Sequence, residues 1–176
     1  MYLISAYFDD KTASILQRWM NEIYEVTGND FMIKNQVPPH MTISAFEQKT
    51  DEKALMLFEY LEKELKNGNV LISSVGEFFP YVIYGEAVQN EYLYRLSQCV
   101  YGAVTKDSDT KVSKYYKPLQ WIPHVTFGKT LEKDEMKAAF EVLQEKFYPI
   151  EAKVERFGIA KPNPHRDLKM IDGVDE

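Results

Sequence analysis

The first part of the chain alternates between apolar runs typical of strands and apolar residues at helical spacing. Residues 2–8 form a largely apolar run that predicts a strand. Asp9 or Asp10 is then placed to cap a helix that is predicted to run to about Val26. The apolar face of this helix consists of Ile15, Leu16, Trp19, Ile23 and Val26.

A second strand, a helix and a third strand follow. An alternating run around His40 predicts a strand, and Thr50 is placed to cap a helix that ends near Asn67. Residues 70–78 are predicted to form the next strand. The apolar positions of the helix are Ala54, Leu57, Phe58, Leu61 and Leu65. The order in this half is therefore β-α-β-α-β.

The second half repeats this order. Residues 81–88 predict a strand and residues 91–104 a helix, and after a longer polar loop an alternating run around His124 predicts another strand. Thr130 is placed to cap the next helix, and residues 150–157 alternate as a final strand. The apolar side of the last helix consists of Met136, Ala139, Phe140, Leu143 and Phe147.

The repeated order predicts a fold of the α+β class. We expect duplicated β-α-β-α-β units, about residues 1–78 and 80–160, related by pseudo-two-fold symmetry within one two-lobed domain spanning residues 1–160. Antiparallel or mixed sheets would line a central cleft, with the helices outside. Residues 161–176 contain two prolines and a polar end, so they are predicted to form a C-terminal tail that is partly ordered.

Composition and charge restrict the class of protein. A chain of 176 residues with 45% hydrophobic residues suits one domain with a substantial core. A net charge of −6 argues against duplex nucleic acid but is compatible with a small or terminal phosphate ligand. The single cysteine, Cys99, has no disulfide partner within the chain, which fits a reducing compartment. Without a long apolar run or a signal-peptide pattern, we expect a cytoplasmic monomer that contacts no membrane.

Two histidines occupy the same tetrapeptide frame. The frames are Pro39-His40-Met41-Thr42 and Pro123-His124-Val125-Thr126, one in each half of the chain. Side chains two apart on a strand share a face, so each motif presents an imidazole beside a hydroxyl while Met41 and Val125 face the core.

A pair of imidazoles suits phosphoryl chemistry without a metal. The ordinary pKa of histidine, about 6.5, allows one ring to act as a base while the other acts as an acid. One ring would take a proton from the attacking water and the other would protonate the departing ribose oxygen. The hydroxyls of Thr42 and Thr126 would donate hydrogen bonds to the non-bridging phosphate oxygens.

A purely structural role or a metal site accounts less well for these residues. A lone histidine on a half-exposed strand is often only a satisfied polar residue, but two in matching frames weaken that interpretation. The spacing of His40, His124, His165 and Cys99 matches no zinc cluster. A magnesium site at Asp9 and Asp10 is conceivable, but helix capping accounts for that pair. We therefore expect no metal and no cofactor.

The two motifs resemble the signature of the two-histidine phosphoesterase superfamily, which includes LigT-like 2′-5′ RNA ligases and cyclic nucleotide phosphodiesterases. The resemblance covers roughly residues 1 to 160. It implies a bilobal α+β fold and metal-independent opening of 2′,3′-cyclic phosphates. By position it implies that His40 and His124 are the catalytic acid and base, and that Thr42 and Thr126 anchor the phosphate. Which histidine is the acid depends on whether the product is a 2′- or a 3′-phosphate.

Further residues of the substrate pocket are predicted from their aromatic side chains and their position in the sequence before the second motif. Tyr115 and Tyr116 precede the second motif and are candidates to stack on a base, as is Trp121. Trp121, however, lies four residues before Val125, so on a continuous strand its side chain would face the core as that of Val125 does.

A second group of candidates lies near the C-terminus. Lys161, His165 and Arg166 would form a basic lid over a phosphate, although a solvated tail accounts for them equally well.

The leading hypothesis is a phosphodiesterase that acts on a 2′,3′-cyclic phosphate at an RNA end or on a small nucleotide. One alternative is 2′-5′ RNA ligation by the same four residues. Another is a non-catalytic module that binds a nucleotide or phosphate in the same cleft.

Overall fold

A computed structural model describes residues 1–175. Its eight strands and five α-helices within these residues belong to the predicted α+β class. The strands are β1 (Tyr2–Phe8), β2 (Met41–Glu47), β3 (Gly68–Phe78), β4 (Val82–Ala87), β5 (Lys111–Val112), β6 (His124–Lys129), β7 (Ile150–Lys161) and β8 (Arg166–Asp172). The helices are α1 (Asp10–Thr27), α2 (Phe31–Lys34), α3 (Asp51–Glu59), α4 (Glu91–Val104) and α5 (Lys133–Lys146), with a 3₁₀ turn, η1 (Lys114–Tyr116).

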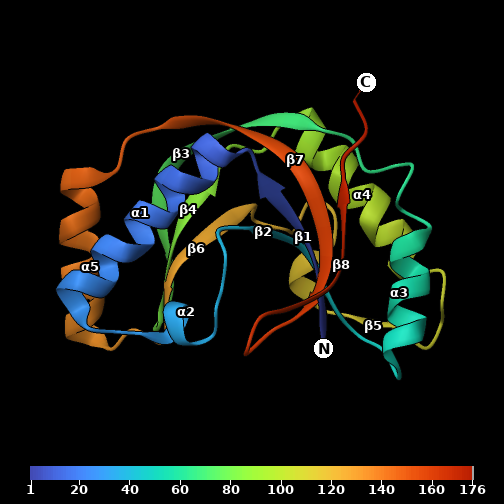
Figure 1. Ribbon diagram of the computed structural model, residues 1–176, viewed down its shortest axis with the longest axis horizontal. Helices are drawn as coiled ribbons and strands as arrows, with labels where there is room; N and C mark the ends of the chain where they lie inside the picture. The colour runs from blue at the N-terminus through green and yellow to red at the C-terminus, as the bar shows by residue number, and fades with distance from the viewer. Residues whose placement is uncertain (176) are drawn as a thin grey trace.

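The eight strands form one antiparallel sheet. Its order is β1-β2-β6-β4-β3-β7-β8, with β5 beside β2, and β1 also pairs with β7. The first half of β7, Ile150–Val154, pairs with β3 and the second half pairs with β1, so β7 joins two arms of the sheet. Figure 1 shows β7 arching from the side of α5 to the side of α3. The equivalence of the two halves as a duplicated unit stays a prediction.

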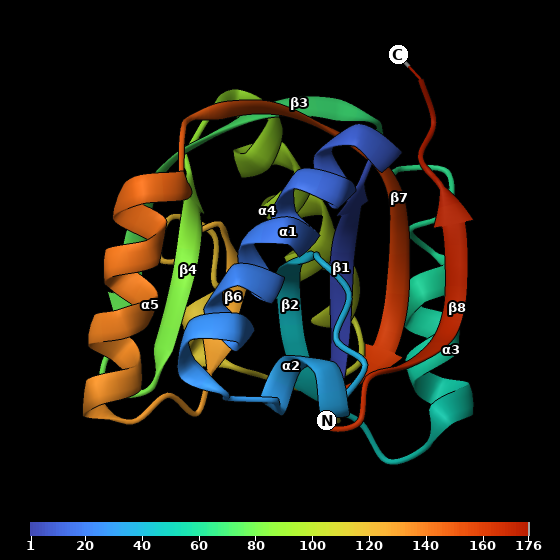
Figure 2. The ribbon, with the colours of Figure 1, turned by 60° about the vertical axis from the view of Figure 1, so that its left-hand side comes forward.

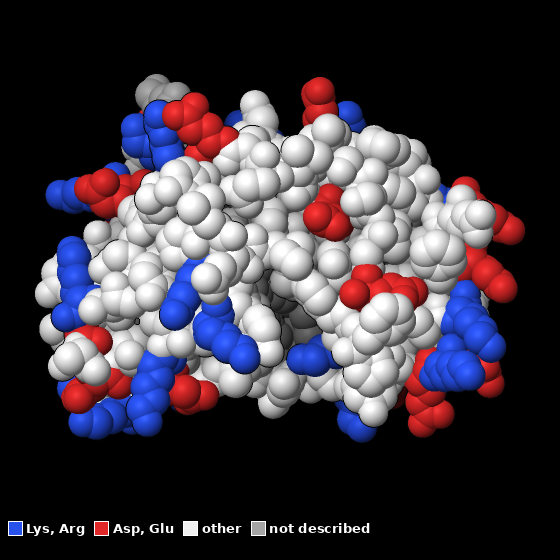
Figure 3. Space-filling view, turned by 180° about the vertical axis from the view of Figure 1, so that it is seen from behind, with Lys and Arg blue, Asp and Glu red and all other residues white. Residues whose placement is uncertain are grey.

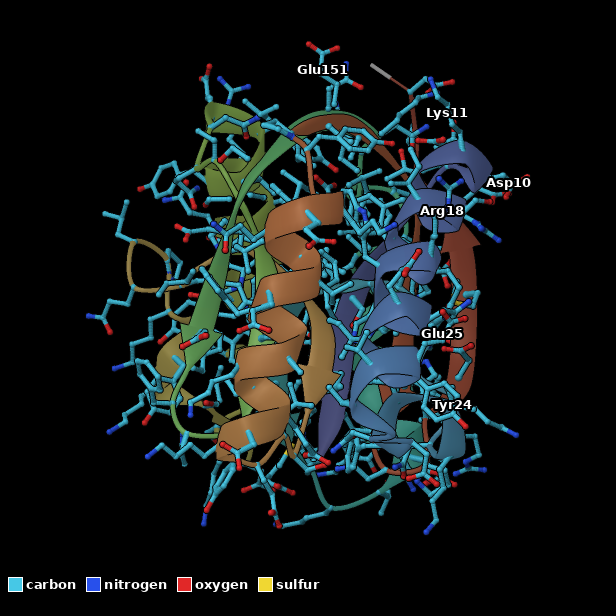
Figure 4. The ribbon with its side chains drawn as sticks, turned by 90° about the vertical axis from the view of Figure 1, so that its left-hand side faces the viewer. Asp10, Lys11, Arg18, Tyr24, Glu25 and Glu151 are labelled. Atoms are coloured by element: carbon cyan, nitrogen blue, oxygen red, sulfur yellow. The ribbon has the colours of Figure 1, made fainter. Side chains whose placement is uncertain are left out.

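The helices cover the outer faces of the two arms. Helices α1 and α5 contact each other, and α1 packs against β6 while α5 packs against β4. On the other arm, α3 contacts α4, which packs against β2 and β3. Figure 2 shows α1 running beside α5 across one face of the sheet. Leu16, Trp19 and Ile23 of α1 are buried as predicted, whereas Val26 near the helix end is exposed. Figure 4 shows Arg18 and the other labelled residues of α1 on its outer side.

Two of the three predicted helix N-caps are confirmed. The carboxylate of Asp9 accepts from the Thr12 N–H at 3.0 Å, so Asp9 rather than Asp10 is the N-cap of α1. Thr50 caps α3 through the Lys53 N–H as predicted, and Asn90, for which no cap was predicted, caps α4. The third predicted cap, at Thr130, is wrong.

Helix α5 begins later than predicted because Thr130 has a positive φ of 60°. The Thr130 hydroxyl donates back to the Lys129 carbonyl instead of accepting from the helix. Glu132 is the N-cap and forms a capping box with Glu135.

Helix α3 is shorter than predicted. It ends at Glu59, and turns replace the predicted last two turns of helix, with the Leu61 N–H donating to the Phe58 carbonyl and the Leu65 N–H to the Leu61 carbonyl. Leu61 and Leu65 are still buried, so the apolar pattern marked core positions rather than continuous helix.

The C-terminal segment is the largest correction to the predicted fold. Instead of a tail outside the pattern, Arg166–Asp172 forms β8 and pairs with β7 along its length. Leu168 and Ile171 pack against the core, which the polar composition of the segment hid. The two prolines therefore belong to the turn of a hairpin, and Figure 2 shows β8 beside β7 at the edge of the sheet. None of the described helices combines the length and apolar character needed to cross a bilayer.

Candidate active site

The two histidine motifs lie on neighbouring strands. Strands β2 and β6 meet at one Cα pair, Met41 with Val125, and both side chains are fully buried as predicted. Extending this antiparallel register by one residue each way sets His40 opposite Thr126 and Thr42 opposite His124. All four polar side chains therefore share the face of the sheet opposite to Met41 and Val125.

Each imidazole is held by a carbonyl of its own chain segment. The His40 Nδ1 lies 2.7 Å from the Pro38 carbonyl oxygen, and the His124 Nδ1 lies 2.7 Å from the Ile122 carbonyl oxygen. A carbonyl has no proton to give, so Nδ1 is the donor in both rings. In the neutral ring the proton-accepting nitrogen is then Nε2, which is the atom available for acid–base chemistry.

Burial lowers the pKa of both imidazoles. The pKa of His40 falls to about 4, first because its ring is removed from water and further because His165 and His124 are close. The pKa of His124 is also lowered by burial, against the opposing effect of the Ile122 carbonyl. Both rings are therefore uncharged at neutral pH in the free protein. An anion placed beside them would favour their protonated forms.

An aromatic pocket adjoins the second motif. The His124 ring contacts Phe78 at 4.9 Å and Tyr84 at 5.1 Å between ring centroids. Beside them is a pocket of about 480 Å³ whose walls are mainly aromatic. It is lined by Glu77, Phe78, Phe79, Tyr115, Tyr116, Gln120, Trp121, Ile122 and His124. Figure 3 shows the face of the molecule opposite to that in Figure 1, with a hollow near its middle and basic side chains beside it.

The structure places the three predicted aromatic candidates differently. Tyr115 and Tyr116 both line the pocket, and Tyr115 is 68% exposed. Trp121 also lines it but is buried, and its indole N–H donates to the Thr42 carbonyl at 3.1 Å. Trp121 therefore ties the segment before the second motif to the strand of the first.

The predicted basic lid does not exist as a unit. Lys161 and Arg166 turn to the Asp51 carboxylate, at 2.6 Å and 3.6 Å. His165 instead packs against His40, with ring centroids 5.5 Å apart.

The two aspartates considered for magnesium serve other purposes. Asp9 caps α1, and Asp10 is exposed. In residues 1–175 no three or more His, Cys, Asp or Glu side chains gather in an arrangement that could hold a metal ion.

Several residues near the imidazoles were not predicted from the sequence. Tyr7 of β1 lies 6.0 Å from His40 between ring centroids, and Asp167 of β8 contacts His165. Phe78 and Tyr84 flank His124. Only the Phe78-Phe79-Pro80 sequence carried a local signal, because proline marks a turn and turns lie at the surface. The others reach the site through strand pairing.

The same fold occurs in solved structures, one of them of a phosphoesterase. The crystal structure of a phosphoesterase matches with a TM-score of 0.65 at 14% identity, covering 98% of this chain and 97% of that one. E. coli LigT complexed with 3′-AMP matches with a TM-score of 0.63 at 12% identity, covering 98% of this chain and 97% of LigT. At these identities the likeness establishes the fold. A comparison with curated proteins finds no significant match.

Fold and motifs together define the class as the two-histidine phosphoesterases, which confirms the resemblance drawn from the sequence. The family model of the 2′-5′ RNA ligase superfamily matches residues 35–166, which include both motifs. The chain belongs to this superfamily. Its membership supports an enzyme with phosphodiesterase- or ligase-type chemistry.

Proposed function

We propose that this protein is a metal-independent phosphodiesterase that opens 2′,3′-cyclic phosphates at RNA ends or on small nucleotides. The observation that carries the proposal is the matched anchoring of two imidazoles on adjoining strands. Each Nδ1 donates to a carbonyl at 2.7 Å, which leaves each Nε2 for the reaction. Two such groups are the acid and base that an in-line displacement at phosphorus requires.

The reaction balances without any other group. Nε2 of one histidine takes a proton from water as the water oxygen bonds to phosphorus. The bond from phosphorus to one ribose oxygen breaks, and that oxygen takes a proton from Nε2 of the other histidine. The Thr42 and Thr126 hydroxyls donate hydrogen bonds to the non-bridging oxygens, where negative charge gathers.

The low pKa values of the free protein fit an anionic substrate. The cyclic phosphate carries one negative charge, which favours the protonated form of an adjacent imidazole. Substrate binding would thus generate the acid that the free protein lacks at neutral pH. This coupling favours a phosphodiester over an uncharged ester.

The pocket beside His124 suits the base of a nucleotide. Tyr115 and Tyr116 offer aromatic faces at its edge, and base–aromatic stacking tolerates any base. Solved structures of E. coli LigT hold 3′-AMP, ATP and NADP⁺, which supports a nucleotide ligand for this fold. With a net charge of −6, we propose a short RNA end or a small nucleotide rather than a duplex.

The alternatives use the same residues. A 2′-5′ RNA ligase would open the cyclic phosphate with the 5′-hydroxyl of a second RNA in place of water, so that this oxygen bonds to phosphorus and the departing ribose oxygen takes the proton. A binding module would hold the nucleotide without turnover, but phosphate binding alone is more commonly achieved by Arg or Lys than by paired imidazoles.

Product analysis tests the proposal. Purified protein in chelator is incubated with a 2′,3′-cyclic nucleotide and with a short RNA ending in a 2′,3′-cyclic phosphate, and 2′- and 3′-phosphate products are resolved. We expect turnover that falls by on the order of a hundredfold or more in His40→Ala and in His124→Ala. The exposed Thr105→Val variant is the control. Absence of turnover on both substrates, or its loss in chelator, would overturn the proposal, and joined RNA products would favour the ligase.

A further inference from the structure

A turn of exposed aromatic residues joins β3 to β4 beside the second histidine motif. Phe78, at the end of β3, faces His124 with ring centroids 4.9 Å apart. In the turn itself Phe79 is 82% exposed and Tyr81 is 56% exposed. Apolar side chains that gather at the surface, rather than lie scattered, mark sites of interaction. The turn is therefore a candidate contact surface next to the imidazole.

A second pocket continues from this turn to helix α5. Its volume is about 550 Å³, which is within the range of sites for small ligands. Glu77 and Phe79 line both this pocket and the aromatic pocket beside His124, so the two pockets adjoin. The residues that line the second pocket are Glu77, Phe79, Pro80, Tyr81, Lys133, Met136, Lys137, Phe140 and Glu141. A groove therefore runs from His124 past Phe79 to α5.

One face of α5 forms a wall of the second pocket. Its lining residues lie at positions 133, 136, 137, 140 and 141, which is the spacing of one helix face. Met136 is buried, whereas Phe140, predicted on the apolar side of this helix, is 45% exposed. The Phe140 ring is therefore open to a ligand in the pocket.

The aromatic turn is held firmly in place. The Tyr81 N–H donates to the Phe78 carbonyl at 3.3 Å, and the Tyr81 carbonyl accepts from the N–H of the buried Leu131 at 3.1 Å. Phe78 stacks on Tyr84 of β4 with ring centroids 4.2 Å apart. These contacts fasten the turn to β4 and to the segment before α5. A ligand that binds there therefore has little backbone to order.

The charged groups of the second pocket suit a nucleotide. Lys133 and Lys137 are exposed and lie one turn apart on α5. Lys137 contacts Asp134 at 3.4 Å, but an exposed pair of this kind is weak, so its ammonium can meet a phosphate. Glu77 and Glu141 repel a phosphate but accept hydrogen bonds from the amino groups of a base. Aromatic faces beside basic groups are the combination by which proteins hold single-stranded nucleic acid.

We propose that the second pocket is a further base-binding subsite, which holds the nucleotide on the 5′ side of the cyclic phosphate in a single-stranded RNA. The terminal base lies in the pocket beside His124, and the next base stacks on Phe79 and Phe140. The phosphate between the two nucleotides lies toward Lys137. The preferred substrate is then an RNA end of at least two nucleotides rather than a mononucleotide. This inference rests on the proposed function, because its starting point is a phosphodiester between His40 and His124.

Continuity with the candidate active site favours RNA over a protein segment as the occupant. Phe79 belongs to both pockets, so a chain that leaves the first pocket meets the second. An RNA strand repeats a flat base and a phosphate, and the groove repeats an aromatic surface, with lysines beside the second pocket. Contact with a second copy of this chain is an outcome of the test.

Binding of RNA that ends in a 3′-phosphate tests the subsite without turnover. Calorimetry in chelator gives the dissociation constants of a nucleoside 3′-monophosphate and of a ribodinucleotide with the same terminal nucleotide. The dinucleotide should bind about fivefold to a hundredfold more tightly, the range for one added stacking contact. Equal dissociation constants would overturn the proposal.

Substitution of Phe140 locates the gain in affinity. In Phe140→Ala the ratio of the two dissociation constants should fall about threefold or more, toward one. Tyr60→Ala, a similarly exposed aromatic residue after α3, is the matched control and should keep the ratio. If Phe140→Ala fails to fold, Tyr81→Ala decides the question, because Tyr81 lies in the turn and lines only the second of the two pockets. A ratio that persists in these variants overturns the place of the subsite.

The contact with Lys137 has a readout of its own. In single-stranded nucleic acid each phosphate contact adds about 0.7 to the slope of log affinity against log salt concentration. Lys137→Gln should lower the slope for the dinucleotide by about this amount. Lys146→Gln, also exposed on α5 but outside the pocket, is the control and should leave the slope unchanged. An unchanged slope in Lys137→Gln would overturn the proposed path of the RNA.

A protein interface would give a different result. If sedimentation shows dimers that dissociate in Phe140→Ala, and the dinucleotide binds no more tightly than the mononucleotide, the turn and α5 form an interface between copies of the chain. That result would overturn the proposal.

Kinetics separate this proposal from the proposed function. Turnover of a 2′,3′-cyclic mononucleotide, with no gain in kcat/KM for a dinucleotide that ends in the same cyclic phosphate, would leave the phosphodiesterase standing and overturn the second subsite. Tighter binding of the dinucleotide that depends on Phe140, without turnover of either compound, would do the reverse.

Discussion

Met41 of β2 and Val125 of β6 are Cα partners, and this pair joins the two strands that carry the histidine motifs. Both side chains are fully buried, so the core beneath the site sets how the four polar residues above it are aligned. The indole N–H of Trp121, which donates to the Thr42 carbonyl, supports the same junction. The alignment of the four polar side chains on one face of the sheet therefore depends on the packing of Met41 and Val125 on the other face.

Met41→Ala should cost stability and activity together. Removal of a fully buried methionine side chain costs about 2–5 kcal/mol of unfolding free energy. Because the cavity lies at the junction of β2 and β6, kcat should also fall at temperatures where the variant is folded. Met20→Ala in α1, also buried but away from the junction, is the control for denaturant unfolding and for turnover. Equal kcat in the two variants would contradict the coupling.

The threonine hydroxyls should matter for rate and little for stability. Thr42→Val and Thr126→Val keep the shape of the side chain and remove the donor to the phosphate oxygens. We expect kcat/KM to fall by about tenfold to a thousandfold in each, as for other donors that stabilise a developing oxyanion. Steady-state kinetics and thermal unfolding measure the two effects. A large loss of stability with unchanged kcat/KM would assign the hydroxyls a structural role instead.

The pH profile of kcat/KM should be bell-shaped with its optimum on the acidic side of neutrality. The pKa of His40 in the free protein is about 4, which sets the acidic limb when His40 is the base. The pKa of His124 is lowered from 6.5, which sets the alkaline limb below neutrality. The profile of kcat should lie at higher pH, because the bound anion raises both values. Rates measured from pH 3.5 to 9 in chelator check this, and an optimum above pH 8 would contradict it.

Stability should also fall with acidification because of His40. The folded protein keeps His40 uncharged down to about pH 4, whereas the unfolded chain takes up a proton near pH 6.5. Between these values the unfolded state binds more protons, so the unfolding free energy rises with pH. The contribution is complete above pH 6.5 and is lost as the pH falls to about 4, a difference on the order of 3 kcal/mol. Unfolding free energies measured with urea across this window should depend less steeply on pH in His40→Gln than in the unaltered protein. Equal dependence on pH in the two proteins would contradict the lowered pKa of His40.

Tyr115 should contribute to binding of the nucleotide base and not to the chemical step. The side chain is exposed at the edge of the pocket beside His124, so Tyr115→Ala removes a stacking surface without opening the core. We expect KM to rise about fivefold to a hundredfold with kcat little changed, the range expected for loss of one stacking contact. Tyr60→Ala, equally exposed but at the end of α3, is the control. A fall in kcat alone would place Tyr115 in the chemical step.

Local features of the fold were predictable from the sequence. Asp9 and Thr50 cap their helices as predicted because a short polar side chain needs only the next turn of its own helix to find its donor. Thr130 failed because its backbone has a positive φ, which the residue type does not reveal.

The segment after Lys161 shows why strand prediction was harder than helix prediction. A helix satisfies its hydrogen bonds within itself, whereas β8 is stable only because the edge of β7 offers a partner. Its polar and proline-rich sequence carries no sign of that partner. Hence the hairpin, and with it the place of His165, could not be predicted.

The candidate catalytic side chains could be identified from the sequence alone. His40 and Thr42, and likewise His124 and Thr126, share a face because the period of a strand is a local property of the backbone. How these residues meet, and which side chains surround them, depends on the folded chain. The register of Met41 with Val125 and the contact of His165 with His40 join residues far apart in the chain. Such contacts depend on strand pairing and core packing, which no short stretch of sequence specifies.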